Sequence, residues 1–154
     1  MENNYKTPDQ SLTIQVQIIM PEHINGADRL FGGQLIKWMD VVAGVAARRH
    51  SNHNITTACI DSLQFRSPAH LNDTVTITGK VTWAGRTSME VKVEAHIEAL
   101  DGTRTLANSA YFVMVALDEN EKPTEVPKLL LRNDEERAEF DDAVRRREER
   151  MKHK

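Results

Sequence analysis

Residues 32–50 read GGQLIKWMDVVAGVAARRH, and this stretch decides the fold. Its apolar residues recur at the three- and four-residue intervals of a helix face. Arg48 and Arg49 follow that pattern, and cations suit the negative end of a helix dipole. The spacing therefore predicts a helix over 34–50 whose apolar face is buried in a core. That face carries Leu35, Ile36, Met39, Val42, Ala43 and Ala46.

Five stretches around this helix are predicted to be strands, three from alternating apolar and polar residues and those over 55–65 and 103–117 from their apolar composition. They cover 12–20, 55–65, 74–83, 89–99 and 103–117, and a turn at Asp101–Gly102 joins the last two as a hairpin. A long loop over 21–33 leads into the helix. The order predicts an α+β fold, with a five-stranded antiparallel sheet wrapped on one central helix. Because such a sheet has two open edges, we expect the chain to dimerise.

The two ends of the chain differ from this body. Residues 1–11 are polar and are expected to be flexible, whereas residues 131–154 are dominated by Glu, Asp and Arg. Asn133 and Glu136 have the spacing of a helix cap, and Phe140, Ala143 and Val144 form a short apolar stripe. We expect a solvated, charged C-terminal helix after a domain that covers 12–130.

The composition is that of a soluble globular protein. The chain has 154 residues, of which 40% are hydrophobic and 28% are charged, with a net charge of -3. This balance argues against nucleic-acid or membrane partners. Cys59 is the single cysteine, so a disulfide within the chain and thiolate metal sites are excluded. With no apolar run long enough to span a membrane and no secretion signal, the cytoplasm is the expected location.

Asp40 is the only charged residue between Lys37 and Arg48. Burying an unpaired carboxylate is costly, so its place in an apolar helix points to a function. The alternative is that Asp40 faces solvent beside Lys37 and Gly44.

Gly32 and Gly33 precede this helix and have two interpretations as well. They could present unpaired backbone N–H groups to an oxyanion, or they could form a turn that needs positive φ.

Other catalytic constellations are missing from the sequence. No Gly-x-Ser-x-Gly elbow of a serine hydrolase occurs. The histidines have no metal-ligand spacing, so no metal site is predicted and each is interpreted as an isolated surface residue: His23, His50, His53, His70, His96 and His153.

Residues 25–40, NGADRLFGGQLIKWMD, resemble the signature of hotdog-fold acyl-CoA thioesterases of the bacterial YciA and mammalian cytosolic acyl-CoA hydrolase type. The resemblance continues through FRSP at 65–68, GRTS at 85–88 and EKP at 121–123, to Pro127. It covers about residues 12–130 and leaves out the charged tail.

The resemblance implies a hydrolase that splits acyl-CoA into a fatty acid and coenzyme A, with no cofactor beyond the coenzyme A of the substrate. It implies that Asn25 and Asp40 are the catalytic pair and come from different subunits of an obligatory dimer, with three dimers assembling as a homohexamer. It assigns contacts with coenzyme A to Arg66, Gly85, Arg86, Thr87 and Ser88. For Arg66 and Arg86, a solvated surface cation is the other interpretation.

In the expected mechanism, N–H groups near Gly32 and Gly33 hold the thioester carbonyl, and Asp40 acts as general base on a water positioned by Asn25. Direct attack by Asp40, giving a mixed anhydride, is left open. Two other functions are alternatives on the same fold. An acyl-thioester dehydratase needs a histidine at the helix, and none lies between Asn25 and Arg49. A non-catalytic acyl-CoA sensor needs a DNA-binding module, for which residues 1–11 are too few.

Overall fold

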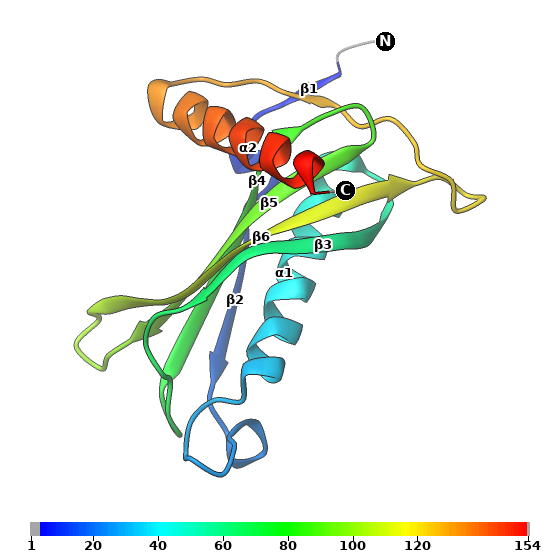
Figure 1. Ribbon diagram of the computed structural model, residues 1–154. Coiled ribbons are helices and arrows are strands. Elements are labelled where there is room, and N and C mark those ends of the chain that lie inside the picture. Colours follow the sequence, from blue (N-terminus) through cyan, green and yellow to red (C-terminus); the bar gives the residue numbers. More distant parts are fainter. Residues whose placement is uncertain (1–3, 154) are drawn as a thin grey trace.

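The computed structural model describes residues 4–153, and it has the predicted α+β architecture (Figure 1). Helix α1 (Gly32–Ser51) lies against one face of a five-stranded antiparallel sheet, and a second helix lies against the other face. No helix of the described part is long and apolar enough to cross a membrane. The strands stand in the order β2 (Thr13–Ile18), β4 (Thr74–Ala84), β5 (Ser88–Glu98), β6 (Arg104–Leu117) and β3 (Asn54–Phe65).

The core lies between α1 and the inner face of the sheet. Leu35, Met39 and Val42 on the helix are buried, as their spacing predicts. On the sheet, Val91 and Val93 face them from β5. At Gly79 a Cβ atom would lie only 2.8 Å from Val42 Cγ1, so the lack of a side chain there lets the helix come close to β4.

Strand β2 has its apolar side turned away from this core. Ile14, Val16 and Ile18 are exposed, whereas Gln15 and Gln17 are half-buried on the side of α1. The alternation of these apolar and polar residues predicted the strand correctly.

The N-terminal segment that was expected to be flexible contains two short elements. Strand β1 (Tyr5–Lys6) pairs in parallel with β7 (Lys128–Leu129), and a 3₁₀ turn, η1 (Pro8–Ser11), follows. The buried Ser11 hydroxyl accepts a 2.8 Å hydrogen bond from the Val81 N–H. These partners are distant in sequence, so local composition carried no sign of them. Another 3₁₀ turn, η2 (Pro21–His23), lies in the loop before α1.

Helix α2 (Asp134–Lys152) is docked on the sheet rather than merely solvated. Its first turn is capped as predicted, because Asn133 Oδ1 accepts a 2.8 Å hydrogen bond from Glu136 N–H. Its main anchor is Arg146, which donates two hydrogen bonds of 2.9 Å to the fully buried Glu90 of β5. The Arg146 guanidinium also stacks 3.5 Å above the ring of Tyr111. Thr82 Oγ1 donates a further 2.8 Å bond to Glu90, so the buried carboxylate is well satisfied.

His50 contradicts the prediction of a surface histidine, because it is fully buried in the last turn of α1. Its Nε2 lies 2.6 Å from the Pro127 carbonyl oxygen, whereas Nδ1 has no hydrogen-bond partner within the described residues. Burial lowers the pKa of His50 below its usual 6.5; the Pro127 carbonyl opposes this shift and Lys6 adds to it. The folded protein therefore favours a neutral His50.

Replacing Arg146 with Ala should lower the free energy of unfolding by about 3–5 kcal/mol, because it removes both charge-assisted hydrogen bonds to the buried Glu90 and leaves only Arg150, 3.8 Å away, as a cation near it. Urea denaturation measures the change. The neighbouring Arg145 is exposed and pairs only with Asp142 on the same helix, so Arg145→Ala should change stability by less than about 0.5 kcal/mol. Equal effects of the two substitutions would contradict a buried ion pair as the anchor.

Stability should fall as the pH drops below 6.5, since the unfolded chain then binds a proton that the folded His50 resists. His50→Gln keeps an N–H for Pro127 but does not titrate, so its free energy of unfolding should decline less over the same range. Denaturant unfolding at several pH values gives both curves. His53→Gln, at an exposed position, should follow the wild type; parallel curves for His50→Gln and wild type would refute this role.

Candidate functional site

Asp40 lies at the border of the buried helix face and is partly exposed. It does not turn to solvent beside Lys37. Its Oδ1 accepts a 2.8 Å hydrogen bond from the hydroxyl of Thr57 on β3. Thr57 stands at a bulge, where the pairing of β3 with β6 shifts between Thr57 and Cys59. Sequence reasoning missed Thr57, because a threonine in a threonine-rich strand has no local mark of function.

The two glycines begin the helix rather than form a turn. Gly32 and Gly33 are its first two residues, and neither has positive φ, so the prediction of a positive-φ turn is wrong. The N–H groups of Gln34 and Leu35 both bond to the Phe31 carbonyl, at 3.0 and 3.2 Å. The N–H groups of Gly32 and Gly33 come before the first helical hydrogen bond and have no acceptor in the helix.

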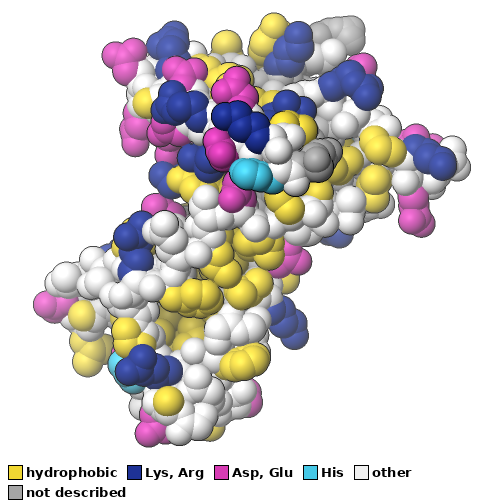
Figure 2. Space-filling view, in the orientation of Figure 1, with side chains coloured by type: hydrophobic (Ala, Val, Ile, Leu, Met, Phe, Trp, Pro, Cys, Tyr) yellow, Lys and Arg dark blue, Asp and Glu magenta, His cyan; other side chains and the backbone are white. Residues whose placement is uncertain are grey.

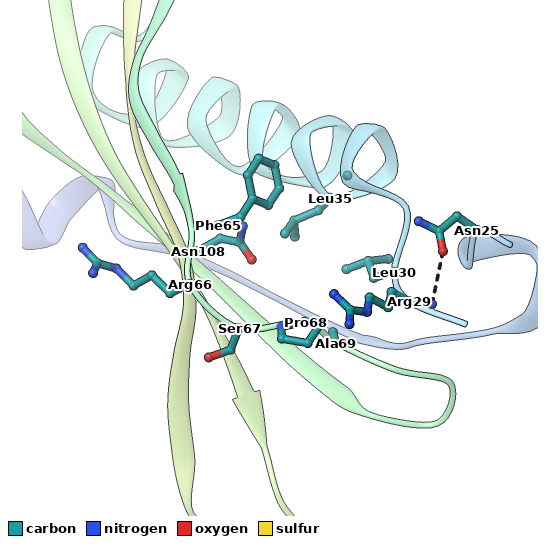
Figure 3. A pocket seen from close by; sticks show the side chains of 11 residues that line it. Asn25, Arg29, Leu30, Leu35, Phe65, Arg66, Ser67, Pro68, Ala69 and Asn108 are labelled. Carbon is teal, nitrogen blue, oxygen red and sulfur yellow. Dashed lines mark hydrogen bonds between the residues drawn. The ribbon is translucent and has the colours of Figure 1, made fainter. Parts of the chain in front are cut away.

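Asn25 is held in the loop that precedes the helix. Its Oδ1 accepts a 2.9 Å hydrogen bond from the N–H group of Ala27 and a 3.3 Å bond from that of Arg29. Figure 3 shows the bond with Arg29. Its backbone N–H donates a 2.8 Å bond to the Arg29 carbonyl. The oxygen of the side chain is thus used by the loop, and Nδ2 is left as the group that can donate to a ligand.

A cavity of about 310 Å³ lies beside this loop (Figure 3). It brings together three of the predicted residues, Asn25, Gly32 and Arg66, with the apolar side chains of Leu35 and Phe65 among the others that line it. Asp40 does not line this cavity. A single chain therefore separates the two residues of the predicted catalytic pair into different surroundings.

The residues predicted to contact coenzyme A are also divided within one chain. Arg66 follows the end of β3 where Phe65 pairs with Asn108. The turn over 85–87 and Ser88 lie at the other end of the sheet, where Ser88 pairs with Val115. Gly85 and Arg86 border a separate cavity of about 630 Å³, which has no residue in common with the cavity at Arg66.

An exposed apolar surface runs beside Asp40. Strand β3 is an edge strand of the sheet, and Val41 of α1 together with Ile60 and Phe65 of β3 is exposed. Figure 2 shows hydrophobic side chains gathered across the middle of the view, below α2, where β3 and α1 lie in Figure 1. An open strand edge next to exposed apolar side chains is typical of a surface that another chain covers.

No cluster of three or more His, Cys, Asp or Glu side chains within residues 4–153 is arranged to hold a metal ion. The candidate catalytic groups are instead the Asp40 carboxylate, the Thr57 hydroxyl, the Asn25 side-chain amide and the backbone N–H groups of Gly32 and Gly33. Such a set can bind and polarise a carbonyl and activate a water.

Comparison with known proteins points to one kind of enzyme. The profile of the Thioesterase superfamily matches residues 28–101. The uncharacterized acyl-CoA thioester hydrolase YkhA of Bacillus subtilis is 36% identical over 146 residues, which are 94% of this chain and 85% of that protein. An apo-hexameric acyl-CoA thioesterase has a crystal structure with 37% identity and a TM-score of 0.93, covering 97% of this chain and 96% of that one.

An acyl-CoA hydrolase from Staphylococcus aureus has been solved with butyryl coenzyme A, coenzyme A and coenzyme A disulfide. It is 31% identical, with a TM-score of 0.92, over 97% of this chain and 92% of that one. Variants of it with an asparagine, an aspartate or a threonine replaced by alanine have also been solved. Those three residues are separated by 15 and 17 positions, as are Asn25, Asp40 and Thr57.

Proposed function

This chain belongs to the hotdog-fold acyl-CoA thioesterases, and we propose that it hydrolyses acyl-CoA with Asp40 as the general base. The observation that carries the assignment is the bond from Thr57 to Asp40 at an exposed edge of the molecule. It supports the proposal because it orients a partly exposed carboxylate, which a second chain and a substrate could reach. The matching spacing of Asn25, Asp40 and Thr57 with the residues replaced in the Staphylococcus aureus enzyme supports the same choice.

In the proposed mechanism each site residue has a separate role in the hydrolysis. The N–H groups of Gly32 and Gly33 polarise the thioester carbonyl and hold the oxyanion that forms on it. Asp40 removes a proton from a water, whose oxygen attacks the carbonyl carbon. Asn25 positions that water through Nδ2, and Thr57 fixes the orientation of the carboxylate. The carbon–sulfur bond then breaks, the proton passes from Asp40 to the leaving thiolate, and a carboxylic acid and coenzyme A are released.

The site is completed by a second copy of the chain. Pairing of β3 with the same strand of a two-fold partner would cover Val41, Ile60 and Phe65 and satisfy the open edge. In antiparallel pairing the two β3 strands run in opposite directions. The end of one sheet that carries Arg66 then lies beside the opposite end of the partner's sheet.

This arrangement accounts for the residues that one chain keeps apart. It places Asn25 of one subunit near the partner's Asp40. It also places Arg66 near the partner's turn over 85–88, so that Gly85, Arg86, Thr87, Ser88 and Arg66 can contact one coenzyme A. An isolated subunit is then inactive. We further propose that three such dimers form a hexamer, the assembly of the similar thioesterase solved in its apo form, and that the enzyme works in the cytoplasm.

Asp40→Asn keeps the shape of the side chain and removes the base, so it should lower the rate of thiol release from butyryl-coenzyme A or palmitoyl-coenzyme A by roughly a hundredfold or more. Asp141→Asn, at an exposed position of α2, is the control and should keep the wild-type rate. Near-full activity of a folded Asp40→Asn protein would rule out Asp40 as the base.

Asn25→Ala and Asp40→Asn should each be nearly inactive alone, but mixed oligomers of the two should regain activity. If each site takes Asn25 from one subunit and Asp40 from another, about one quarter of the sites in an equimolar mixture are intact. Thiol release after co-refolding measures the recovery. Asn25→Ala mixed with the Asn25→Ala/Asp40→Asn double variant is the control, since it rebuilds no site. If both residues act within one chain, the test mixture stays as inactive as the control.

A further inference from the structure

His50 is a buried side chain of α1 that the proposed mechanism does not use. It lies in the last turn of the helix, and its Nε2 is 2.6 Å from the Pro127 carbonyl oxygen. A carbonyl oxygen can only accept, so Nε2 carries the proton and donates this hydrogen bond. Burying a polar ring costs free energy, and Nδ1 has no partner within residues 4–153. An apolar side chain would avoid that cost, so the bond to Pro127 is what histidine adds at this position.

Pro127 belongs to a segment over 123–129, which we call the strap. Figure 1 shows the strap running from the end of β6 across the top of the molecule toward α2, past the turn between β4 and β5. Proline has no backbone N–H, so the strap cannot donate a hydrogen bond at Pro123 or Pro127. The bond with His50 therefore fixes the strap at Pro127 from the side of the core.

The residue before Pro127 holds the turn between β4 and β5. The Val126 N–H donates a 2.9 Å hydrogen bond to the Arg86 carbonyl. The next carbonyl of the turn, that of Thr87, accepts a 3.0 Å bond from the Ala116 N–H of β6. The turn is thus held on one side by a strand of the sheet and on the other side by the strap. Because His50 fixes Pro127, the buried ring is connected to the turn through the strap.

The strap and the turn also form two walls of one cavity, of about 630 Å³. Gly85 and Arg86 border it from the turn, and Glu125, Val126 and Lys128 border it from the strap. Arg86 and Lys128 are exposed cations on the two walls, and such side chains bind phosphate groups. A displaced strap would move Arg86 and would also change the distance between the two walls.

We propose that His50 is a positioning residue for coenzyme A. Through Pro127 it holds the strap against the turn, so that Arg86 meets the phosphates of the substrate. The proposal rests on the coenzyme A contact of the proposed function, and it adds a residue that touches neither the substrate nor Asp40. Asp40 lies ten residues earlier in α1, about three turns away. His50 should therefore affect the binding of coenzyme A and not the chemical step.

The test replaces His50 with Leu, which fills a similar volume but cannot donate to Pro127. The KM for butyryl-coenzyme A and the Kd for coenzyme A should rise roughly two- to tenfold, the worth of one hydrogen bond, while kcat stays at the wild-type value. His50→Gln keeps an N–H near the place of Nε2, so it should restore most of the wild-type KM. Thiol release gives kcat and KM, and calorimetry gives Kd without depending on catalysis.

Two controls separate positioning from a general loss of stability. Val75→Ala removes buried volume at the far end of β4, so it should lower the midpoint of urea unfolding and leave KM unchanged. The butyryl thioester of N-acetylcysteamine has the reacting group but no phosphate, so its kcat/KM should be the same for His50→Leu and the wild type. An equal loss with both substrates would overturn the proposal.

A wild-type KM and Kd for His50→Leu, where Arg86→Ala raises both, would refute the positioning role alone. So would a lower kcat at an unchanged KM. If Arg86→Ala also leaves both constants unchanged, the turn does not bind coenzyme A, and the contact in the proposed function fails together with this role. An inactive wild type whose Kd still responds to His50→Leu would support the role and count against the proposed mechanism.

A second variant keeps the proposal testable if His50→Leu does not fold. Val126→Pro removes the N–H that bonds Arg86, at a position that the following Pro127 already biases toward extended backbone. It should raise KM and Kd by the same factor with kcat unchanged, and wild-type values would show that the strap does not position the turn.

Discussion

The contact between α1 and the inner face of the sheet is the constraint on which the rest of the structure depends. Each large apolar side chain that it buries contributes roughly 1.5–3 kcal/mol. The close approach at Gly79 brings Val42 directly onto β4. Because this face of α1 is buried in the core, Asp40 lies at the border of the buried face. Its carboxylate accepts a hydrogen bond from the Thr57 hydroxyl of β3 while it stays partly exposed.

The order of the strands then distributes the remaining surfaces. One edge of the sheet, β3, lies beside Asp40, and the other edge, β2, carries exposed apolar side chains. The sheet therefore carries exposed apolar side chains at both of its edges. In the proposed dimer, the first of these surfaces would complete the active site.

Helix α2 is fixed by charge more than by apolar burial. Glu90 is fully buried between β5 and α2, and its carboxylate has Arg146 and Thr82 as partners. A buried ion pair adds little net stability, but removing one partner is costly, so the pair favours the docked position of α2 over positions that separate Arg146 from Glu90. Arg150 bonds Asp61 at 2.8 Å, which ties the same helix to β3 near the second bulge of that strand. The charged tail therefore supports the strand that carries Thr57.

The sequence alone determined the elements of the fold and part of the site. Periodicity located α1, β2, β4 and β5, because one face of a helix or strand repeats with the period of that element, whereas apolar composition and turn signals located β3 and β6. The isolated charge of Asp40 and the glycine pair also stand out locally, and the family resemblance added Asn25. Only the tertiary structure decided which residues meet: Thr57 with Asp40, Arg146 with Glu90, His50 with Pro127, and β1 with β7. These partners lie 17 to 123 positions apart in the chain, so no local pattern marks them, and only the packing of the elements brings them together.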